Sequence, residues 1–432
     1  MKKIIISALV LSFALIGTGC PGRGDTYMRF SWWGNPLRNT QTTEVLNMFT
    51  EQTGIEVEEL VGTFGEYWGM MSTLAVARNL PDVIQHNLPQ MLEHVESGLL
   101  VDLRPFIRDG RINTDNVPQA VMEQGRVGDG IFAIPMGMNV AAIVYNRTLL
   151  ESLGLYAPRN ITLDQFASIA RQVYTQTGVR TNWVSEAPIN PMIVHLRAQG
   201  VEAFEPAPGG GWRLGGTPEN WQNFFDFVNL GIQEGWHFRL EDWGGRDRSA
   251  LATNPLVYPP DLTANPNLRS WLAFQWSNQI EALQTAIGSD SVLNLTTPPS
   301  TDPQRSNFGR ASMLLAITRD ASNQNAAAQL IDFYTNTQAV HEIILGERGI
   351  PINTVIASAT APRLSPGGQI NAEFVAWVNQ PENSSSFMGL EPEGAGQFRS
   401  ELILVTDMVM AGSLTPAAAA QRLFAFGNIV IR

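Results

Sequence analysis

The sequence predicts an α/β protein, and two observations lead to this class. Short apolar strands alternate with amphipathic helices directly after the N-terminal segment, and strand–helix–strand order indicates a parallel sheet with right-handed crossovers. The chain has 432 residues, which at about 150 residues per domain favours two or three domains rather than one.

The first predicted unit is a strand followed by a helix. Residues 26–34, "TYMRFSWWG", have strand character and end at a glycine. Residues 42–54 place Val45, Leu46 and Phe49 on one helical face and also end at a glycine, which is typical of a helix C-terminus.

The same alternation continues along the chain. Residues 55–60 alternate with a period of two, 66–80 have a helical pattern, and 81–86 begin the next strand. Three later segments are predicted as amphipathic helices, namely 221–235, 324–337 and 415–426, with Thr415 as the N-cap of the last.

The N-terminus has the pattern of an export signal. Two lysines precede an apolar run from Ile4 to Ile16, which is too short to span a bilayer comfortably. Small residues then lead to Cys20, the one cysteine of the chain, and the segment resembles a bacterial lipoprotein signal. That resemblance implies a signal peptide over 1–19, a lipidated Cys20 as the mature N-terminus and a tether over 20–25. Gly17 stands where such signals prefer Leu, so an ordinary secretory signal is the alternative.

The charge of the chain excludes several kinds of partner. Both lysines precede residue 20, so the remaining chain carries 26 arginines against 40 acidic residues, a formal charge of −14. Such an acidic body argues against nucleic acid and against broad binding to anionic lipid, which leaves the lipid anchor as the expected membrane contact. Without further lysines there is no Schiff-base lysine and no P-loop lysine.

Several segments together resemble one family. They are 64–103, which contains "PDVIQH"; 128–155, which contains "IPMGMN"; 271–279, "WLAFQWSNQ"; 346–353, "GERGIPIN"; and 411–423, "AGSLTPAAAAQRL". In order and spacing they resemble the extracellular solute-binding proteins (family 1) of carbohydrate ABC importers, which are similar to maltodextrin-binding proteins. The resemblance covers nearly the whole chain after residue 25.

This resemblance implies a fold, a role and partners. The fold is the two-lobe periplasmic-binding-protein-like α/β fold with a ligand cleft between the lobes. We expect the N-terminal lobe to hold 26–138 and 277–318, and the C-terminal lobe 143–272 and 323–432. The expected role is to bind an oligosaccharide by hinge closure and to deliver it to the permease subunits of the transporter. We expect a monomer, anchored at the cell membrane and facing the periplasm or the cell exterior, without a cofactor and without catalysis.

Sugar sites combine aromatic rings, which stack on pyranose faces, with planar polar groups, which bond hydroxyls. Residues of both kinds at predicted strand ends or at the predicted lobe crossing are the expected ligand-binding set: Trp33, Asn35, Phe64, Tyr67, Gln85, His86, Asn139, Trp243, Trp276 and Asn278. For each tryptophan the alternative is burial in the core, and for His86 it is a structural or surface role. Trp221 and Trp377 lie inside helical patterns and are predicted to be core residues.

The charge of the sugar stays open at this point. Arg348 in "ERGIP" could bind a carboxylate or brace a loop, and bracing is the favoured interpretation. An anionic uronide would suit an Arg-only set of basic residues, because guanidinium bonds carboxylates in a bidentate way. The net negative charge opposes this at long range, so a neutral oligosaccharide is an equal alternative.

Two other function classes were weighed. A lipid-anchored glycosidase would need two carboxylates roughly 5–10 Å apart across a cleft. Glu241–Asp242 and Glu391/Glu393 are candidates, but such pairs arise by chance in an acidic chain. A binding protein for a peptide or a metal is the other class. The five histidines are scattered and no HExxH motif occurs, so no metal site is predicted.

Overall fold

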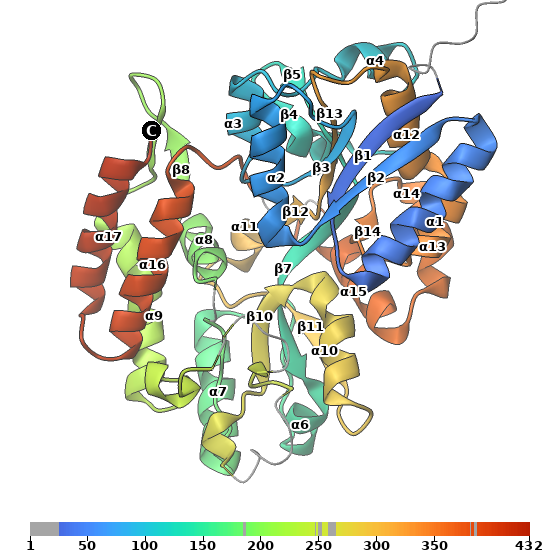
Figure 1. Cartoon of the computed structure of the whole chain (residues 1–432). Coiled ribbons are helices and arrows are strands. Elements are labelled where there is room, and N and C mark those ends of the chain that lie inside the picture. Colours follow the sequence, from blue (N-terminus) through green and yellow to red (C-terminus); the bar gives the residue numbers. More distant parts are fainter. Residues whose placement is uncertain are drawn as a thin grey trace, which may run out of the picture.

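The computed structural model describes residues 26–184, 187–246, 248, 253–257, 265–380, 382–383 and 387–432. The predicted signal peptide, Cys20 and the tether lie outside the described residues. The structure contains two five-stranded sheets with helices packed around them, so the predicted α/β class is confirmed (Figure 1).

The first sheet is built mainly from the N-terminal part of the chain. Its strand order is β2-β1-β3-β13-β6, with bounds β1 Tyr27–Trp33, β2 Glu56–Gly62, β3 Val83–His86, β6 Ile134–Pro135 and β13 Leu314–Ile317. β1 runs parallel to β2 and β3, as predicted, whereas β13 is antiparallel to β3 and β6. The helices of this part are α1 Pro36–Thr53, α2 Phe64–Val76, α3 Met91–Glu96, α4 Arg104–Arg108, α5 Gln119–Met122, α12 Gln324–Asn336 and α13 Gln338–Ile344.

The second sheet is organised around one long strand, β7 Gly137–Asn146. All its partners are antiparallel to it: β10 Leu272–Trp276, β11 Leu293–Thr296, β12 Gly309–Ala311 and β14 Ile350–Pro351. β7 follows β6 of the first sheet almost directly and therefore carries the chain from one sheet to the other, as Figure 1 shows.

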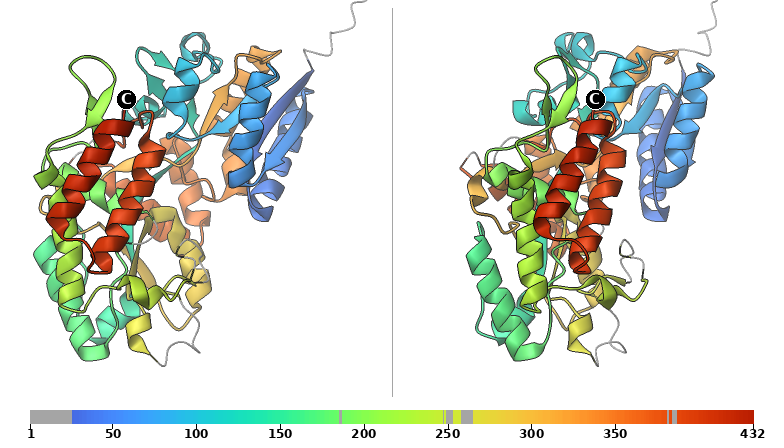
Figure 2. Two further views of the ribbon diagram at one scale, coloured as in Figure 1. Left: turned by 60° about the vertical axis from the view of Figure 1, so that its left-hand side comes forward. Right: turned by 90° about the vertical axis from the view of Figure 1, so that its left-hand side faces the viewer.

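The remaining helices surround the second sheet. They are α6 Arg147–Ser152, α7 Leu163–Thr177, α8 Ile189–Ala198, α9 Pro218–Gln233, α10 Ile280–Ile287, α11 Pro303–Ser306, α14 Thr354–Thr360, α15 Pro366–Val378, α16 Ala395–Met410 and α17 Pro416–Val430. α17 packs against both α9 and α16, and Figure 2 shows the pair α16 and α17 side by side. Two small hairpins complete the fold: β4 Arg126–Val127 with β5 Gly130–Ile131, and β8 Phe204–Pro206 with β9 Trp212–Leu214.

Local sequence signals explain where the early helices begin and end. α1 begins earlier than predicted because the Asn35 side chain accepts from the Arg38 amide and Pro36 stands at the first helical position. It ends at Gly54, which adopts the left-handed conformation as expected. α2 begins with a capping box in which Thr63 and Glu66 satisfy each other's backbone amides.

Two hydrophobic clusters form the core, and β7 contributes to both. Val140 and Ala142 belong to the first cluster, which also holds the interior of the first sheet. Ala141 and Ile143 belong to the second cluster, together with α7, α9 and α16. Successive side chains of a strand point to opposite faces, so β7 is shared between the two clusters. We call each cluster, with the elements that form it, a packing unit.

The cluster membership differs from the predicted lobe boundaries in two segments. The prediction assigned 277–318 to the N-terminal lobe, but β11 pairs with β7 of the second sheet and only β13 of this segment enters the first sheet. It assigned 323–432 to the C-terminal lobe, but residues of α12 and α13 belong to the first cluster, where α13 packs against α1. The division into two lobes with those boundaries stays a prediction.

Candidate functional site

An aromatic group lies at the carboxyl end of β1 and the start of α2. The Trp33 ring contacts Phe64, Tyr67 and Trp68, with centroid distances of 5.6, 5.1 and 5.7 Å. We call these four residues the aromatic cluster. Phe64 is 56% exposed and Trp33 is 8% exposed, so the cluster forms a surface with a solvent-facing edge. Asn35 is exposed beside it, where its side chain caps α1.

Two predicted ligand residues lie beneath this surface and are already engaged. Tyr67 is fully buried, and its hydroxyl donates to the Gln85 carbonyl oxygen at 2.7 Å. Gln85 is also fully buried, donates to the Trp33 carbonyl oxygen at 3.3 Å and accepts from Arg348. Their hydrogen bonds hold Trp33 in place, so their contribution to binding would be to position that ring.

His86 is buried in a polar and aromatic pair. Its Nε2 lies 2.9 Å from Nδ1 of His94, and both imidazoles contact the Trp68 ring. Burial, and to a smaller extent the neighbouring His94, lowers the pKa of His86 to about 3. The pKa of His94 is lowered as well, mainly by burial. The two rings therefore form a neutral pair in which one nitrogen donates and the other accepts.

The buried histidines predict how stability depends on pH. Burial lowers the pKa of His195, His237 and His341 to about 4, below the value of about 6.5 in an unfolded chain. The unfolded chain therefore binds more protons below pH 6.5, and stability falls as pH drops from 6.5 towards 4, by roughly 3 kcal/mol per histidine. Urea unfolding at several pH values measures this. A flat stability curve between pH 7 and 5 would contradict it.

A second group of polar and aromatic residues lies near the start of β7, where the chain has passed from the first sheet into the second. Asn139 pairs with Arg310 of β12, and Ala141 pairs with Trp276 of β10, so all four side chains share one face of the sheet. The Arg310 guanidinium lies over the Trp276 ring, 4.1 Å from its centroid. Within the described chain, the Oδ1 atoms of Asn139 and Asn278 are buried without a hydrogen-bond partner. We call Asn139, Trp276, Asn278 and Arg310 the crossing set.

The other predicted aromatic and basic residues have structural positions. Trp243 is 3% exposed and packs against Phe238, as its core alternative predicted. Trp221 is fully buried, whereas Trp377 is half-buried in α15. Arg348 is buried and donates to Gln85 and Thr42, so it braces the "ERGIP" loop against the first sheet.

Sequence reasoning did not identify Trp68 and Arg310. Trp68 could have been found, because it adjoins Tyr67 at the start of the same helix and its ring completes the aromatic cluster. Arg310 has no local signal. Its position over Trp276 depends on the pairing of β12 and β10 with β7, which joins segments far apart in the chain.

Two cavities lie between the packing units. The larger has a volume of about 580 Å³ and is lined on one side by the α3 region, including Gln90 and Glu93, and on the other by Glu391, Glu393 and Arg399 near α16. The smaller, about 420 Å³, is lined by residues 120–128 and by 387–390. We call these two cavities the cleft.

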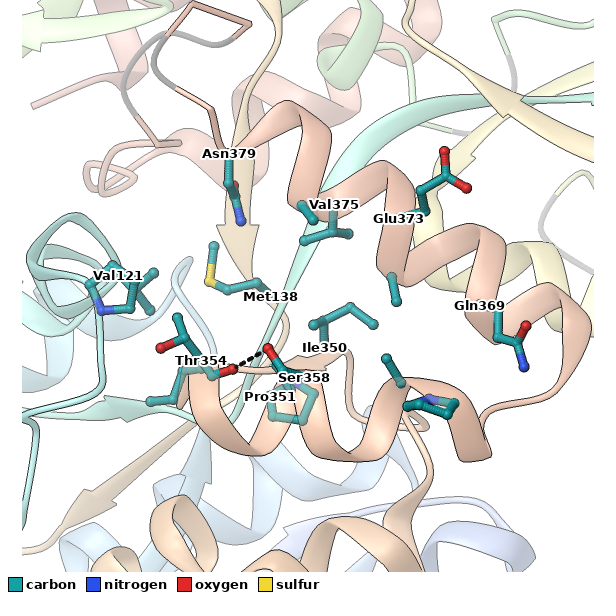
Figure 3. Close-up of a pocket in the computed structure, with 17 residues that line it drawn as sticks. Val121, Met138, Ile350, Pro351, Thr354, Ser358, Gln369, Glu373, Val375 and Asn379 are labelled. Atoms are coloured by element: carbon teal, nitrogen blue, oxygen red, sulfur yellow. Dashed lines mark hydrogen bonds between the residues drawn. The ribbon is translucent and has the colours of Figure 1, made fainter.

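A further cavity lies elsewhere and is mainly apolar (Figure 3). Its volume is about 640 Å³, and Met138, Ile350 and Val375 line it together with α14 and α15. Met138 precedes Asn139 on β7, so its side chain points to the sheet face opposite the crossing set. None of the predicted ligand residues lines this cavity, and none lines either cavity of the cleft.

Two further observations concern the kind of site. The described residues contain no group of three or more His, Cys, Asp and Glu side chains arranged to hold a metal ion. Of the helices that the structure describes, none combines the length and the apolar character needed to cross a membrane.

Comparison with solved structures shows the fold. A solute-binding protein of family 1 from Alicyclobacillus acidocaldarius is 18% identical with a TM-score of 0.75, over 93% of this chain and 98% of that one. An oligogalacturonide-binding protein from Yersinia enterocolitica, in complex with saturated digalacturonic acid, is 16% identical with a TM-score of 0.74 over the same shares. An ABC substrate-binding protein from Listeria monocytogenes, in complex with cycloalternan, is 13% identical with a TM-score of 0.73, again over 93% and 98%.

Comparison with sequence families agrees with the fold. The family described as bacterial extracellular solute-binding protein matches residues 44–255, which include the helix α2, the strand β7 and the helix α9. The predicted periplasmic-binding-protein-like fold is confirmed by the similarity to solved structures over more than nine-tenths of the chain. The family match over residues 44–255 and the fold of the described chain both make this protein similar to the bacterial extracellular solute-binding proteins.

Proposed function

We propose that this protein is the substrate-binding component of an ABC importer and that its ligand is an oligosaccharide. The observation that carries the proposal is that a solute-binding fold contains both kinds of group: the aromatic cluster, which has a solvent-facing edge, and the polar crossing set. Aromatic faces and amide or guanidinium groups are the two kinds of contact that a sugar ring needs. Structures of similar fold from Yersinia and Listeria hold oligosaccharides, which supports the same ligand class.

The cleft has the dimensions for several sugar units. Its two cavities have volumes of about 580 and 420 Å³, within the range of small-molecule sites. The larger cavity begins at Pro89 and Gln90, three residues beyond His86, whose imidazole contacts Trp68 of the aromatic cluster. Stacking surfaces on separate segments favour an oligosaccharide over a monosaccharide.

Ligand binding is proposed to close a hinge at the start of β7. The chain passes from β6 of the first sheet into β7 of the second within a few residues, and Arg348 braces the neighbouring loop. A ligand that contacts both packing units binds the closed form more tightly than the open form. It therefore shifts the open–closed equilibrium by that difference in affinity.

A glycosidase is the enzyme alternative, and the candidate carboxylates do not favour it. Glu391 is paired with Arg399, Asp242 with Arg180 and Glu241 with Arg239. A carboxylate that is engaged with a guanidinium is not free to exchange a proton with a substrate. Incubation with chromogenic glycosides separates the two classes, and we expect no release of the chromophore.

Isothermal titration calorimetry tests the proposed ligand class. The full mature protein is titrated with neutral and acidic oligosaccharides of two to six units, with short peptides and with zinc. Saturable heat with at least one oligosaccharide is the expected result. Binding of a peptide or zinc together with failure of every sugar would overturn the carbohydrate proposal while leaving the fold intact.

Lipid anchoring through Cys20 is the proposed mode of attachment. The Cys20→Ser variant lacks the thiol that would carry lipid, so we expect it to leave the membrane fraction or to accumulate as an uncleaved precursor. Fractionation and the mass of the mature protein measure the effect. The control is Ser152→Ala, since Ser152 is exposed. Ser31→Cys is not a suitable control, because Ser31 is buried. Unchanged processing and membrane association of Cys20→Ser would refute lipidation.

A further inference from the structure

Arg310 is a partly buried cation for which the described chain provides no acidic partner. No ion pair and no hydrogen bond joins its guanidinium to another described residue, and its Nε is buried without a partner. By contrast, Arg348 donates hydrogen bonds to Gln85 and Thr42, and Arg197 is paired with Glu202. Removing a cation from water without a partner costs free energy, so an unmatched arginine of this kind indicates a missing anion.

The nearest acidic group does not neutralise Arg310. Burial lowers the pKa of Arg310 to about 10, while Glu391 raises it and Arg399 lowers it. Glu391 is itself held in an ion pair with Arg399, so the two neighbouring charges offset each other. Arg310 therefore stays protonated near neutral pH and retains an uncompensated positive charge beside the cleft.

The position of Arg310 on Trp276 suits a planar anion. A guanidinium stacked on an aromatic ring keeps its in-plane N–H donors free for a carboxylate. Arg310 and Asn139 are paired across β12 and β7, so an amide with an unpartnered Oδ1 lies next to these donors within the described chain. A carboxylate can accept two N–H bonds from Arg310 while a hydroxyl of the same sugar donates to Asn139.

We infer that Arg310 binds the carboxylate of a uronic acid, so that the ligand is an anionic oligosaccharide. This inference rests on the proposed function, because it assigns the charge of the sugar at the same site. It also moves the expected carboxylate contact from Arg348, which is buried and engaged, to Arg310. Three glutamates that line the cleft and form no ion pair with a described residue are exposed, and salt screens their repulsion over about 10 Å: Glu93, Glu96 and Glu393.

The test compares each acidic oligosaccharide with its own neutral form. Digalacturonic and trigalacturonic acid, and the same compounds with their carboxyl groups reduced to alcohols, are titrated by calorimetry into the full mature protein. The variants are Arg310→Gln and Arg310→Lys. The matched control is Arg305→Gln, since Arg305 is exposed on α11 and pairs with Asp302.

We expect the wild-type protein to bind at least one acid at least about 30-fold more tightly than its reduced form. Arg310→Gln should abolish this preference, because the acid then loses more affinity than its reduced form does. Arg310→Lys should keep part of the preference, because a point charge lacks the bidentate geometry, and Arg305→Gln should behave as wild type. Unfolding midpoints near that of wild type verify that the variants fold.

Two results would overturn the inference in different ways. If the wild-type protein binds the reduced forms as tightly as the acids, or if Arg310→Gln keeps the preference, the role of Arg310 is wrong while the sugar-binding function stands. If the wild-type protein binds neither form of these or any other oligosaccharide, the proposed function itself fails and the inference fails with it.

Discussion

Replacing Arg348 by Ala is expected to lower the free energy of unfolding by about 3–5 kcal/mol, through lost hydrogen bonds and a new cavity. Arg348 is 3% exposed and donates to Gln85 and Thr42, which are also buried. Its removal leaves both acceptors without their partner and opens a cavity between the "ERGIP" loop and the first sheet. Chemical denaturation followed by tryptophan fluorescence measures the change.

Arg363 provides the matched control for this prediction. Its side chain is 56% exposed and forms a surface ion pair with Glu342. Surface pairs contribute about 0–1 kcal/mol, so Arg363→Ala should leave the unfolding midpoint nearly unchanged. A loss below about 1 kcal/mol for Arg348→Ala would show that the brace does not stabilise the fold.

The second large effect is expected at Trp276. The Trp276→Ala variant removes the ring on which Arg310 lies and a stacking face beside β7, so it should weaken oligosaccharide binding by about 2–4 kcal/mol, or 30- to 1000-fold in Kd. Trp276 is half-buried at the end of β10, and circular dichroism checks that the variant keeps its fold.

Trp212→Ala serves as the control for Trp276→Ala. Trp212 is also half-buried but lies in the β8–β9 hairpin, away from the crossing set. Calorimetry should give a Kd for this variant within a few-fold of the wild-type value. Equal losses of affinity in both variants would indicate a general loss of structure, and no loss at Trp276→Ala would remove this residue from the site.

The early part of the fold could be predicted because its signals are local. The strand β1, the helix α1 and the strand β2 each have the periodicity of their own structure, and Gly54 ends the helix where the sequence indicates. The start of α2 was placed two residues late, since the capping box of Thr63 with Glu66 outweighs the flexible Gly65.

The arrangement of later segments could not be predicted in the same way. β10, β11 and β12 all pair with β7, and such pairings join residues more than a hundred positions apart, about which local periodicity carries no information. The predicted lobe boundaries were placed at the expected crossing segments, and β11 lies in the segment assigned to the N-terminal lobe although it pairs with β7 of the second sheet.

The candidate site shows what residue type alone leaves open. Tyr67 and Gln85 have the chemistry of ligand contacts, but their partners in the core occupy them. Arg348 and Arg310 are the same amino acid in different surroundings. Arg348 donates to Gln85 and Thr42, whereas the Nε of Arg310 has no partner among the described residues. Only the packing around each side chain distinguishes a brace from a binding group.

Small-angle X-ray scattering tests the central claim most directly, namely that one sugar ligand joins the two packing units across the cleft. Scattering from the mature protein is recorded with and without a saturating oligosaccharide whose binding calorimetry has established. The account predicts a smaller radius of gyration in the bound state, because closure brings the α3 region towards the Glu391–Arg399 segment. An unchanged radius of gyration at full saturation would contradict closure around the ligand.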